Sequence, residues 1–167
     1  YVDSLLTEHQ IPAVSLAVWR QQQCYQAAAG ILNRDTDVQA TTDSIFQIGS
    51  ITKVFTACLV MQLVEASRVE LDAPVKHYLR DFTIADAHAS QTITVRQLLN
   101  HSSGIAGDFC PDDSNEQSNA IARYLDRINL LPLVHAPGAQ FSYSNAAFVV
   151  AGRLVEVLLG LPWHQAI

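Results

Sequence analysis

The stretch Phe46-Gln47-Ile48-Gly49-Ser50-Ile51-Thr52-Lys53-Val54-Phe55 places a hydroxyl and an ammonium three residues apart at the start of a long apolar segment. In a helix, residues i and i+3 lie on one face, so the side chains of Ser50 and Lys53 can interact. A serine hydroxyl becomes a good nucleophile when a base takes its proton, and a partly desolvated lysine can be that base. The spacing therefore indicates acyl transfer through a covalent serine intermediate. The alternative is that Ser50 only caps the helix.

The segment from about Ser50 to Ser67 predicts a buried helix, because apolar residues occur on all sides of it. Gly49, just before the serine, would let another backbone come close. Lys53 in the first turn would then be partly desolvated. Cys58, inside the same helix, is expected to pack as a small hydrophobic residue.

Composition excludes several classes of function. The 167 residues include 10 Lys and Arg against 16 Asp and Glu, a net charge of −6, which argues against a nucleic-acid partner. No apolar run approaches the roughly 18 residues of a membrane span. The three cysteines and six histidines show no metal-site spacing, so no metal is expected. Asp112-Asp113 is interpreted as a solvated loop rather than a ligand pair.

The first part of the chain predicts a short helix and a β-hairpin. Val2 to His9 is expected to be helical, and Ala13 to Trp19 and Cys24 to Ile31 to form two strands. The polar stretch from Asn33 to Asp43 is interpreted as a loop. Residues 1–45 would thus hold two sheet strands and a loop, and such a hairpin needs further partners for stability.

Residues 46–167 are expected to be mostly helical. Thr94-Val95-Arg96-Gln97 has the spacing of a capping box and would open a helix. Pro74 would begin a short helical turn. Further helices are predicted from about Asn119 to Asn129 and from about Asn145 to Leu159, the last one ending at Gly160.

A second group of reactive side chains lies in Phe141-Ser142-Tyr143-Ser144-Asn145, between a Pro-Gly turn and the last long helix. Tyr143 and Asn145 are two residues apart in a turn, so both can point to one side. A phenol can relay a proton, and a neighbouring ammonium favours its phenolate. A carboxamide can donate to a substrate carbonyl and accept from an ammonium. The alternative is a buried tyrosine next to an Asn helix cap.

Together, Ser50-x-x-Lys53 and Tyr143-x-Asn145 resemble the motifs of the penicillin-recognising serine hydrolases. The branch they resemble contains the class C β-lactamases, the DD-carboxypeptidases and the family VIII esterases. Three stretches carry the resemblance: residues 46–57, Leu-Leu-Asn-His-Ser-Ser-Gly-Ile at 98–105, and Pro-Gly-Ala-Gln-Phe-Ser-Tyr-Ser-Asn onward at 137–152. The Ser-x-x-Lys signature is typical of β-lactamases and penicillin-binding proteins.

The resemblance implies an α/β fold of the β-lactamase/transpeptidase type, with a helical domain beside an antiparallel sheet. Ser50 would be the acylated nucleophile, and Lys53 and Tyr143 would share the base and acid roles. Asn145 would orient Lys53 and bind the substrate, and the Ser50 N–H would give half of an oxyanion hole. His101-Ser102-Ser103-Gly104 is expected to be scaffold. The substrate would be a β-lactam, a D-Ala-D-Ala peptide or an ester, with no metal or organic cofactor.

The family's third motif, Lys-Thr-Gly or His-x-Gly on a strand, has no counterpart after Asn145. The chain is therefore expected to be the N-terminal portion of such a protein, with weak or no turnover by itself, or else a short form that pairs with another copy. Two other functions stay open: a penicillin-binding sensor that acylates without turnover, and a degenerate scaffold. The resemblance favours a periplasmic or secreted location and leaves a cytoplasmic one open.

Overall fold

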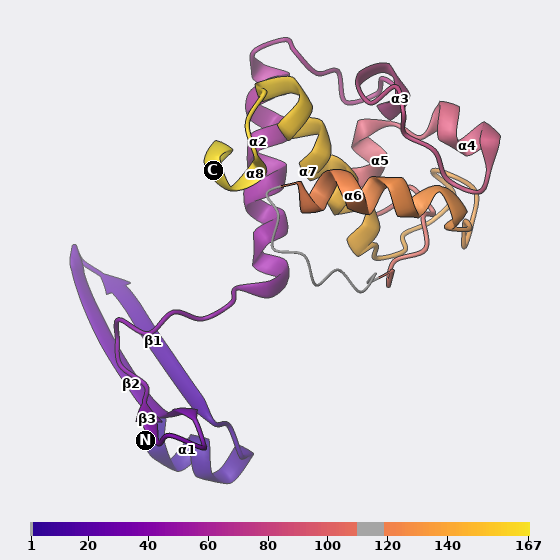
Figure 1. Cartoon of the computed structure of the whole chain (residues 1–167). Helices are drawn as coiled ribbons and strands as arrows, with labels where there is room; N and C mark the ends of the chain where they lie inside the picture. Colours follow the sequence, from indigo (N-terminus) through magenta and orange to yellow (C-terminus); the bar gives the residue numbers. More distant parts are fainter. Residues whose placement is uncertain (1, 110–118) are drawn as a thin grey trace. The chain divides into compact units, whose positions relative to one another are not determined.

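The computed structural model describes residues 2–109 and 119–167. The chain divides into two compact units, Tyr1–Ile48 and Gly49–Ile167, which we call the N-terminal unit and the helical unit. Each is described by itself (Figure 1). Cys110 and the Asp112-Asp113 pair lie outside the described residues, so the interpretations placed on them stay predictions.

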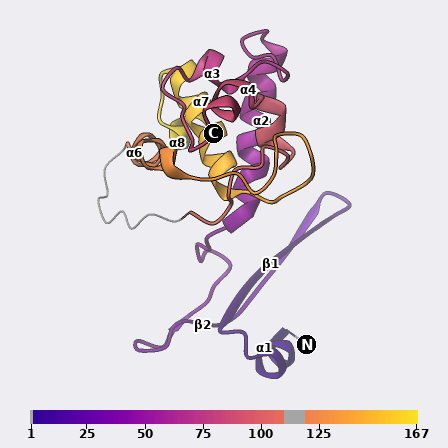
Figure 2. The same cartoon turned by 90° about the vertical axis from the view of Figure 1, so that its right-hand side faces the viewer.

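The N-terminal unit is a helix followed by an antiparallel sheet. Its elements are α1 (Val2–His9), β1 (Ala13–Arg20), β2 (Gln23–Asn33) and β3 (Val38–Gln39), with strand order β1-β2-β3. The hairpin register runs from Ala13 opposite Gly30 to Arg20 opposite Gln23. Helix α1 contacts β2 and lies at the end of the hairpin away from its turn (Figure 2). Helix α1 and the two long strands form where the sequence predicts them.

The hairpin turn is made by Gln21 and Gln22, both with positive φ (49° and 64°). Two successive left-handed residues fit the right-handed twist of the strands, although Asn-Gly is the usual choice. Strand β3 is a correction, because the stretch from Asn33 to Asp43 was expected to be loop throughout. Among the described residues of this unit, Leu6 alone is buried.

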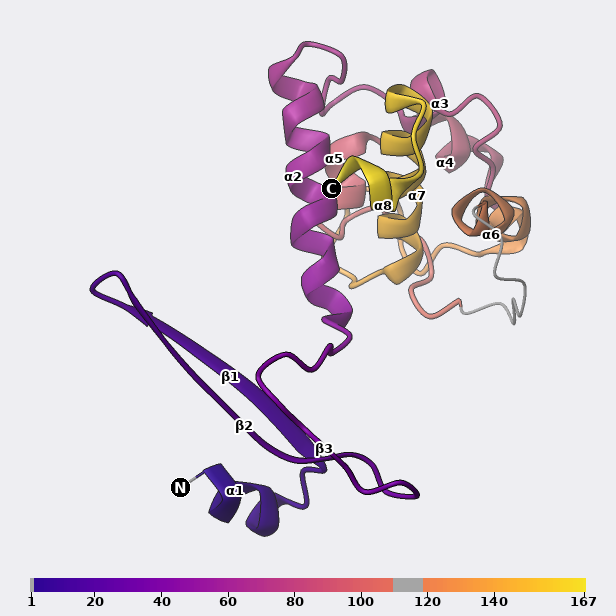
Figure 3. The ribbon, with the colours of Figure 1, turned by 60° about the vertical axis from the view of Figure 1, so that its left-hand side comes forward.

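The helical unit is organised around its longest helix, α7. Its elements are η1 (Gly49–Ile51), α2 (Thr52–Glu65), α3 (Val75–Tyr78), α4 (Ala87–Thr92), α5 (Val95–Leu99), α6 (Ala120–Arg127), η2 (Ile128–Leu130), α7 (Asn145–Leu159) and α8 (Trp163–Ala166). Helix α7 contacts α2, α3, α5, α6 and α8. Figure 3 shows α2 and α7 running side by side. The core includes Val60, Leu98, Val150 and Leu154, all fully buried.

Helix α2 differs from its prediction in burial. It buries Leu59, Val60 and Leu63 along one side, but Val54 and Phe55 are exposed. Its apolar residues on all sides therefore do not make α2 a fully buried helix, because it packs against α7 along one side. Cys58 is also exposed rather than packed as a small hydrophobic residue.

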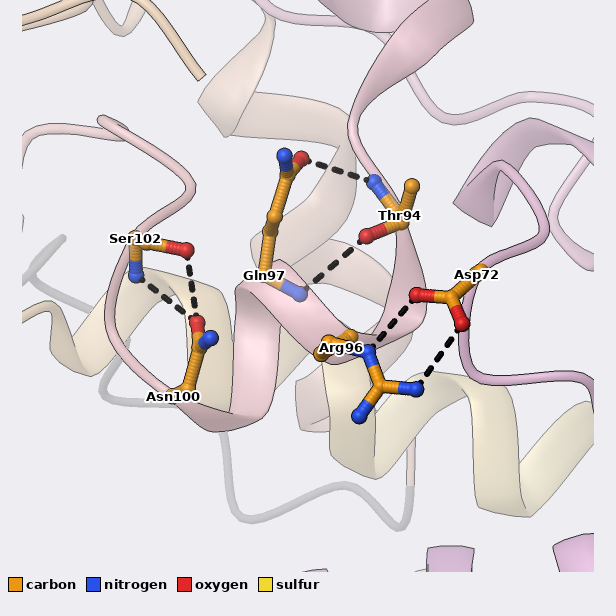
Figure 4. A network of polar contacts seen from close by, with 6 residues as sticks. All are labelled: Asp72, Thr94, Arg96, Gln97, Asn100 and Ser102. Atoms are coloured by element: carbon orange, nitrogen blue, oxygen red, sulfur yellow. Dashed lines mark hydrogen bonds and ion pairs between the residues drawn. The ribbon is translucent and has the colours of Figure 1, made fainter. Parts of the chain in front are cut away.

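Helix α5 is fixed at its start by the predicted capping box (Figure 4). The Thr94 hydroxyl accepts from the Gln97 N–H at 3.3 Å, and the Gln97 side chain accepts from the Thr94 N–H at 3.0 Å. On the exposed side, the Arg96 guanidinium donates to both carboxylate oxygens of Asp72, at 2.6 and 2.8 Å. These contacts tie α5 to the chain around α3.

The segment that leaves α5 is also held by side chains. The side-chain oxygen Oδ1 of Asn100 accepts from the N–H of Ser102 at 3.1 Å and from its hydroxyl at 2.7 Å (Figure 4). His101, between them, has a φ of 59°, a left-handed conformation that is uncommon for residues other than glycine. The chain therefore turns sharply after α5, and the next residues run towards the segment before α7.

Candidate active site

Ser50 and Lys53 lie one turn apart at the start of α2. Ser50 is in the 3₁₀ turn η1, and Lys53 is in the first turn of the α-helix. The Lys53 ammonium donates to Ser50 Oγ at 3.2 Å. The residue that caps α2 is Ile51, with no side-chain cap. The Ser50 hydroxyl therefore contacts Lys53 instead of capping the helix.

Tyr143, two residues before α7, and Asn145, the first residue of α7, reach the same point. Tyr143 Oη lies 2.6 Å from Ser50 Oγ, and Asn145 Oδ1 accepts from Lys53 Nζ at 2.7 Å. The cap of α7 is Ser144, whose hydroxyl accepts from the Ala147 N–H. Asn145 is thus free of the capping role, and its carboxamide faces the lysine. The structure brings all four predicted side chains together.

Charge within this group favours the tyrosine's deprotonated form. The pKa of Tyr143 lies below its ordinary value of 10.0, because hydrogen bonding from Lys53, followed by hydrogen bonding from Ser50, stabilises the phenolate. The positive charge of Lys53 adds to this effect, whereas desolvation and the Asp108 carboxylate oppose it. Lys53 Nζ also lies 4.7 Å from the centre of the Tyr143 ring.

The arrangement places a hydroxyl next to two groups that can take up a proton, and leaves the hydroxyl open to solvent. Ser50 Oγ contacts both a phenol and an ammonium, so its proton can leave by a direct hydrogen bond. Tyr143 is 43% exposed and Ser50 is exposed, whereas Lys53 and Asn145 are half-buried. An incoming carbonyl compound can therefore reach Ser50 while Lys53 stays fixed behind it.

A small apolar pocket of about 240 Å³ adjoins Lys53 and Asn145. Its lining residues are Thr52, Lys53, Thr56, Ile121, Asn145, Phe148, Val149, Gly152 and Trp163. A larger pocket of about 650 Å³, between the segment after α3 and helices α6 and α7, is lined by none of the four candidate site residues. The candidate site lies at Ser50 because the reactive side chains meet there, although the larger pocket lies elsewhere.

Two further features of the described residues concern metal binding and membrane insertion. Across residues 2–109 and 119–167, no three His, Cys, Asp or Glu side chains are grouped so that they could hold a metal ion. No helix in those ranges is long and apolar enough to cross a membrane.

Two residues at the site were not singled out from the sequence. Phe148, one turn into α7, stacks on His101 with ring centres 5.0 Å apart and lies 5.7 Å from Lys53 Nζ. His101, expected to be scaffold, lies 4.5 Å from the Tyr143 ring. The signal for Phe148 was its spacing three residues after Asn145, which places both on one face of α7.

Comparison with known proteins shows the family of this chain. The family model described as Beta-lactamase matches residues 1–167. The chain belongs to the Beta-lactamase family. Its fold is accordingly the predicted α/β arrangement of helices with an antiparallel sheet.

Similar proteins share this family's sequence and fold over nearly the whole chain. Penicillin-binding protein 4 of Amycolatopsis lactamdurans is 42% identical over 165 residues, which is 99% of this chain and 43% of that protein. A crystal structure of SurE superposes with a TM-score of 0.79 at 30% identity, covering 98% of this chain and 35% of that one. A class C β-lactamase gives 0.81 at 21% identity, covering 99% and 44%; that match shows the fold alone. The chain thus spans less than half the length of these proteins.

Proposed function

We propose that this chain carries the nucleophile and the proton carriers of a serine hydrolase that forms an acyl-enzyme at Ser50. The observation that supports this most strongly is the pair of contacts at Ser50 Oγ, 2.6 Å from Tyr143 Oη and 3.2 Å from Lys53 Nζ. A lone Ser-x-x-Lys spacing is compatible with many roles. Here the phenol of Tyr143, about ninety residues further along the chain, also contacts Ser50 Oγ. A second group next to the hydroxyl that can take its proton is typical of an activated nucleophile.

In the proposed acylation step, Ser50 Oγ attacks the substrate carbonyl carbon and forms a C–O bond. Its proton moves to the Tyr143 phenolate or to an unprotonated Lys53, either of which is within hydrogen-bond distance. The electron pair of the carbonyl moves onto its oxygen, which accepts from the Ser50 backbone N–H. Such a donor typically contributes about 10²–10³ in rate.

The tetrahedral intermediate then collapses. The bond from carbon to the leaving nitrogen or oxygen breaks, and the leaving group takes the proton from the residue that accepted it. Water attacks the ester of Ser50 in the second half of the reaction, with the same residues moving its proton, and releases the acid. Asn145 holds Lys53 in place through the 2.7 Å hydrogen bond and can donate its NH₂ to the substrate.

The proposed substrates are a β-lactam, a D-Ala-D-Ala peptide or an ester. The family and the relative named penicillin-binding protein 4 support the first two classes. A sensor that acylates without turnover is a second candidate, and it predicts an adduct on Ser50 without release of product. A degenerate scaffold is the third, and it predicts no adduct.

Exposure of the purified chain to one member of each substrate class tests the proposal. We expect release of product, or a trapped acyl group, with at least one class, and none of either with Ser50→Ala. Ser4→Ala, which changes an exposed serine of α1, is the matched control and should behave as the native chain. Equal product release by Ser50→Ala would contradict the proposal. A trapped acyl group without product would favour the sensor.

A further inference from the structure

The turn that carries Tyr143 and leads into Asn145 is hydrogen-bonded through its backbone to residues 101–107. The Ser142 N–H donates to the His101 carbonyl at 2.8 Å, and the Asn145 N–H donates to the Gly107 carbonyl at 3.2 Å. Between them, the Ser144 N–H donates to the imidazole Nδ1 of His101 at 3.1 Å. Two of these three bonds therefore end on His101, one of them on its side chain.

The imidazole also packs against the reactive phenol. Its ring centre lies 4.5 Å from that of Tyr143, with the planes tilted by 31°, and 5.0 Å from that of Phe148. Phe141 closes a further side with an edge contact at 5.6 Å. The ring of His101 thus packs against the ring of Tyr143, while its Nδ1 holds the backbone N–H of Ser144.

We infer that His101 is a positioning residue, whose neutral imidazole holds the Tyr143-Ser144-Asn145 turn so that the Tyr143 phenol stays on Ser50. This inference rests on the proposed function only for its effect on rate. The placement itself depends on the contacts of the helical unit alone.

Protonation of His101 would end this arrangement. Nδ1 can accept from the Ser144 N–H only when it carries no proton, so the neutral ring must have its hydrogen on Nε2. An imidazolium would place an N–H against the backbone N–H and break the bond. Among the described residues, the titratable groups that face the ring are Lys53 of α2 and Tyr143 of the turn before α7; the Phe141 and Phe148 rings complete its surroundings.

The environment keeps the ring neutral at ordinary pH. Burial lowers the pKa of His101 below its usual 6.5, and the positive charge of Lys53 lowers it further. The structure therefore predicts that the turn is fixed near neutral pH and is released in acid, below the ordinary pKa of a histidine.

Nuclear magnetic resonance of the 167-residue chain tests the placement without any need for activity. With ¹⁵N-labelled histidine, we expect Nδ1 of His101 to be unprotonated at neutral pH. The Ser144 amide and the Tyr143 ring resonances should shift together with the titration of His101. In a His77→Asn variant, which changes an exposed histidine of α3, these shifts should be unaltered. A protonated Nδ1 at neutral pH, or Tyr143 resonances that ignore the titration, would overturn the inference.

Two substitutions of His101 separate its hydrogen bond with the Ser144 N–H from its ring contacts, because both remove the ring and only one keeps an acceptor. His101→Asn places an oxygen where Nδ1 was, cannot be protonated, and tolerates the left-handed backbone; His101→Gly tolerates that backbone but has no acceptor. We expect acylation by a penicillin to slow by roughly 10²-fold in His101→Gly and by less than about tenfold in His101→Asn. Circular dichroism melting confirms that each variant is folded.

The pH profile distinguishes positioning from a purely structural role. In the native chain, the logarithm of the acylation rate should fall by about one unit per pH unit where the base alone is protonated, and by about two where His101 is protonated as well. His101→Asn should keep the shallower slope. A pH profile of acylation that is the same in the native chain and in His101→Asn would overturn the inference. A native chain that forms no adduct would contradict the proposed function instead, and the resonance experiment would still decide the role of His101.

Discussion

Lys53 donates hydrogen bonds to Ser50 and Asn145 and lies close to the face of the Tyr143 ring. Lys53→Met keeps most of the side-chain length but removes the charge and both donors. We expect acylation to slow by about 10²–10⁴-fold. The pKa of Tyr143 should rise towards its ordinary value, because Lys53 is the largest cause of its lowering. Absorbance titration of the tyrosinate, with Tyr143→Phe to identify the signal, measures that shift.

Tyr143 makes a prediction of its own about pH. A base with a lowered pKa becomes active as it loses its proton, so the acylation rate should rise with pH through a midpoint below 10.0 and then level off. Tyr143→Phe should remove this rise and slow acylation by about 10²–10⁴-fold. Stopped-flow measurement across the pH range gives both quantities. A variant with the native profile would show that Tyr143 is not the base.

At the scale of single residues, the sequence predicted which side chains meet at Ser50 better than it predicted the groups around them. Ser50, Lys53, Tyr143 and Asn145 were found because each type has a distinct chemical use and a fixed spacing. The sequence predicted His101 to be scaffold. Its contacts with the Tyr143 ring and with the Ser144 N–H join residues about forty positions apart, and a single sequence does not reveal such long-range contacts.

Helix α5 leads into the segment that holds the candidate site, and its capping box is the clearest feature on which to test that support. Thr94→Ala removes the hydroxyl that accepts from the Gln97 N–H, so the folded state should lose about 1 kcal/mol of stability. Urea denaturation measures the loss. Thr92→Ala is the matched control, since that hydroxyl bonds only a carbonyl of its own helix. An equal loss in both variants would contradict the capping role.

The elements that the sequence missed are all short, although the short helices α3 and α5 were predicted from Pro74 and from a capping box. Helices α4 and α8 have six and four residues, too few for an apolar period to show. The one local signal for α4 is Asp86, whose carboxylate caps it by accepting from the Ala89 N–H. Strand β3 has two residues and depends on its pairing with β2, which a local pattern does not reveal.

The long elements, by contrast, were predicted with nearly correct bounds. Helix α7 combines a side-chain cap at Ser144, a continuous apolar side and a left-handed Gly160 at its end. Each of these signals is local, so a single sequence contains all of them. The burial of α2 was overestimated, because composition tells how apolar a helix is but not which of its sides meets another element.

For the helical unit as a whole, α7 supplies both the core and the support of Asn145. Leu154→Ala opens a cavity at a fully buried position and should cost about 2–5 kcal/mol. Val157→Ala, at an exposed position of the same helix, should cost much less. Thermal or urea unfolding compares the two. Similar losses in both would show that α7 does not pack as described.

The whole chain spans less than half the length of the relatives that it matches, so the account of its function depends on the four residues gathered at Ser50. The predicted pairing of a sheet edge with a second copy stays a prediction.

Intact-mass spectrometry after exposure to a penicillin tests the central claim most directly. The account predicts that the native chain gains the mass of one penicillin, that peptide mapping places it on Ser50, and that Ser50→Ala gains none. A native chain that forms no adduct with a penicillin, a D-Ala-D-Ala peptide or an ester, or an adduct of equal yield on Ser50→Ala, would contradict it.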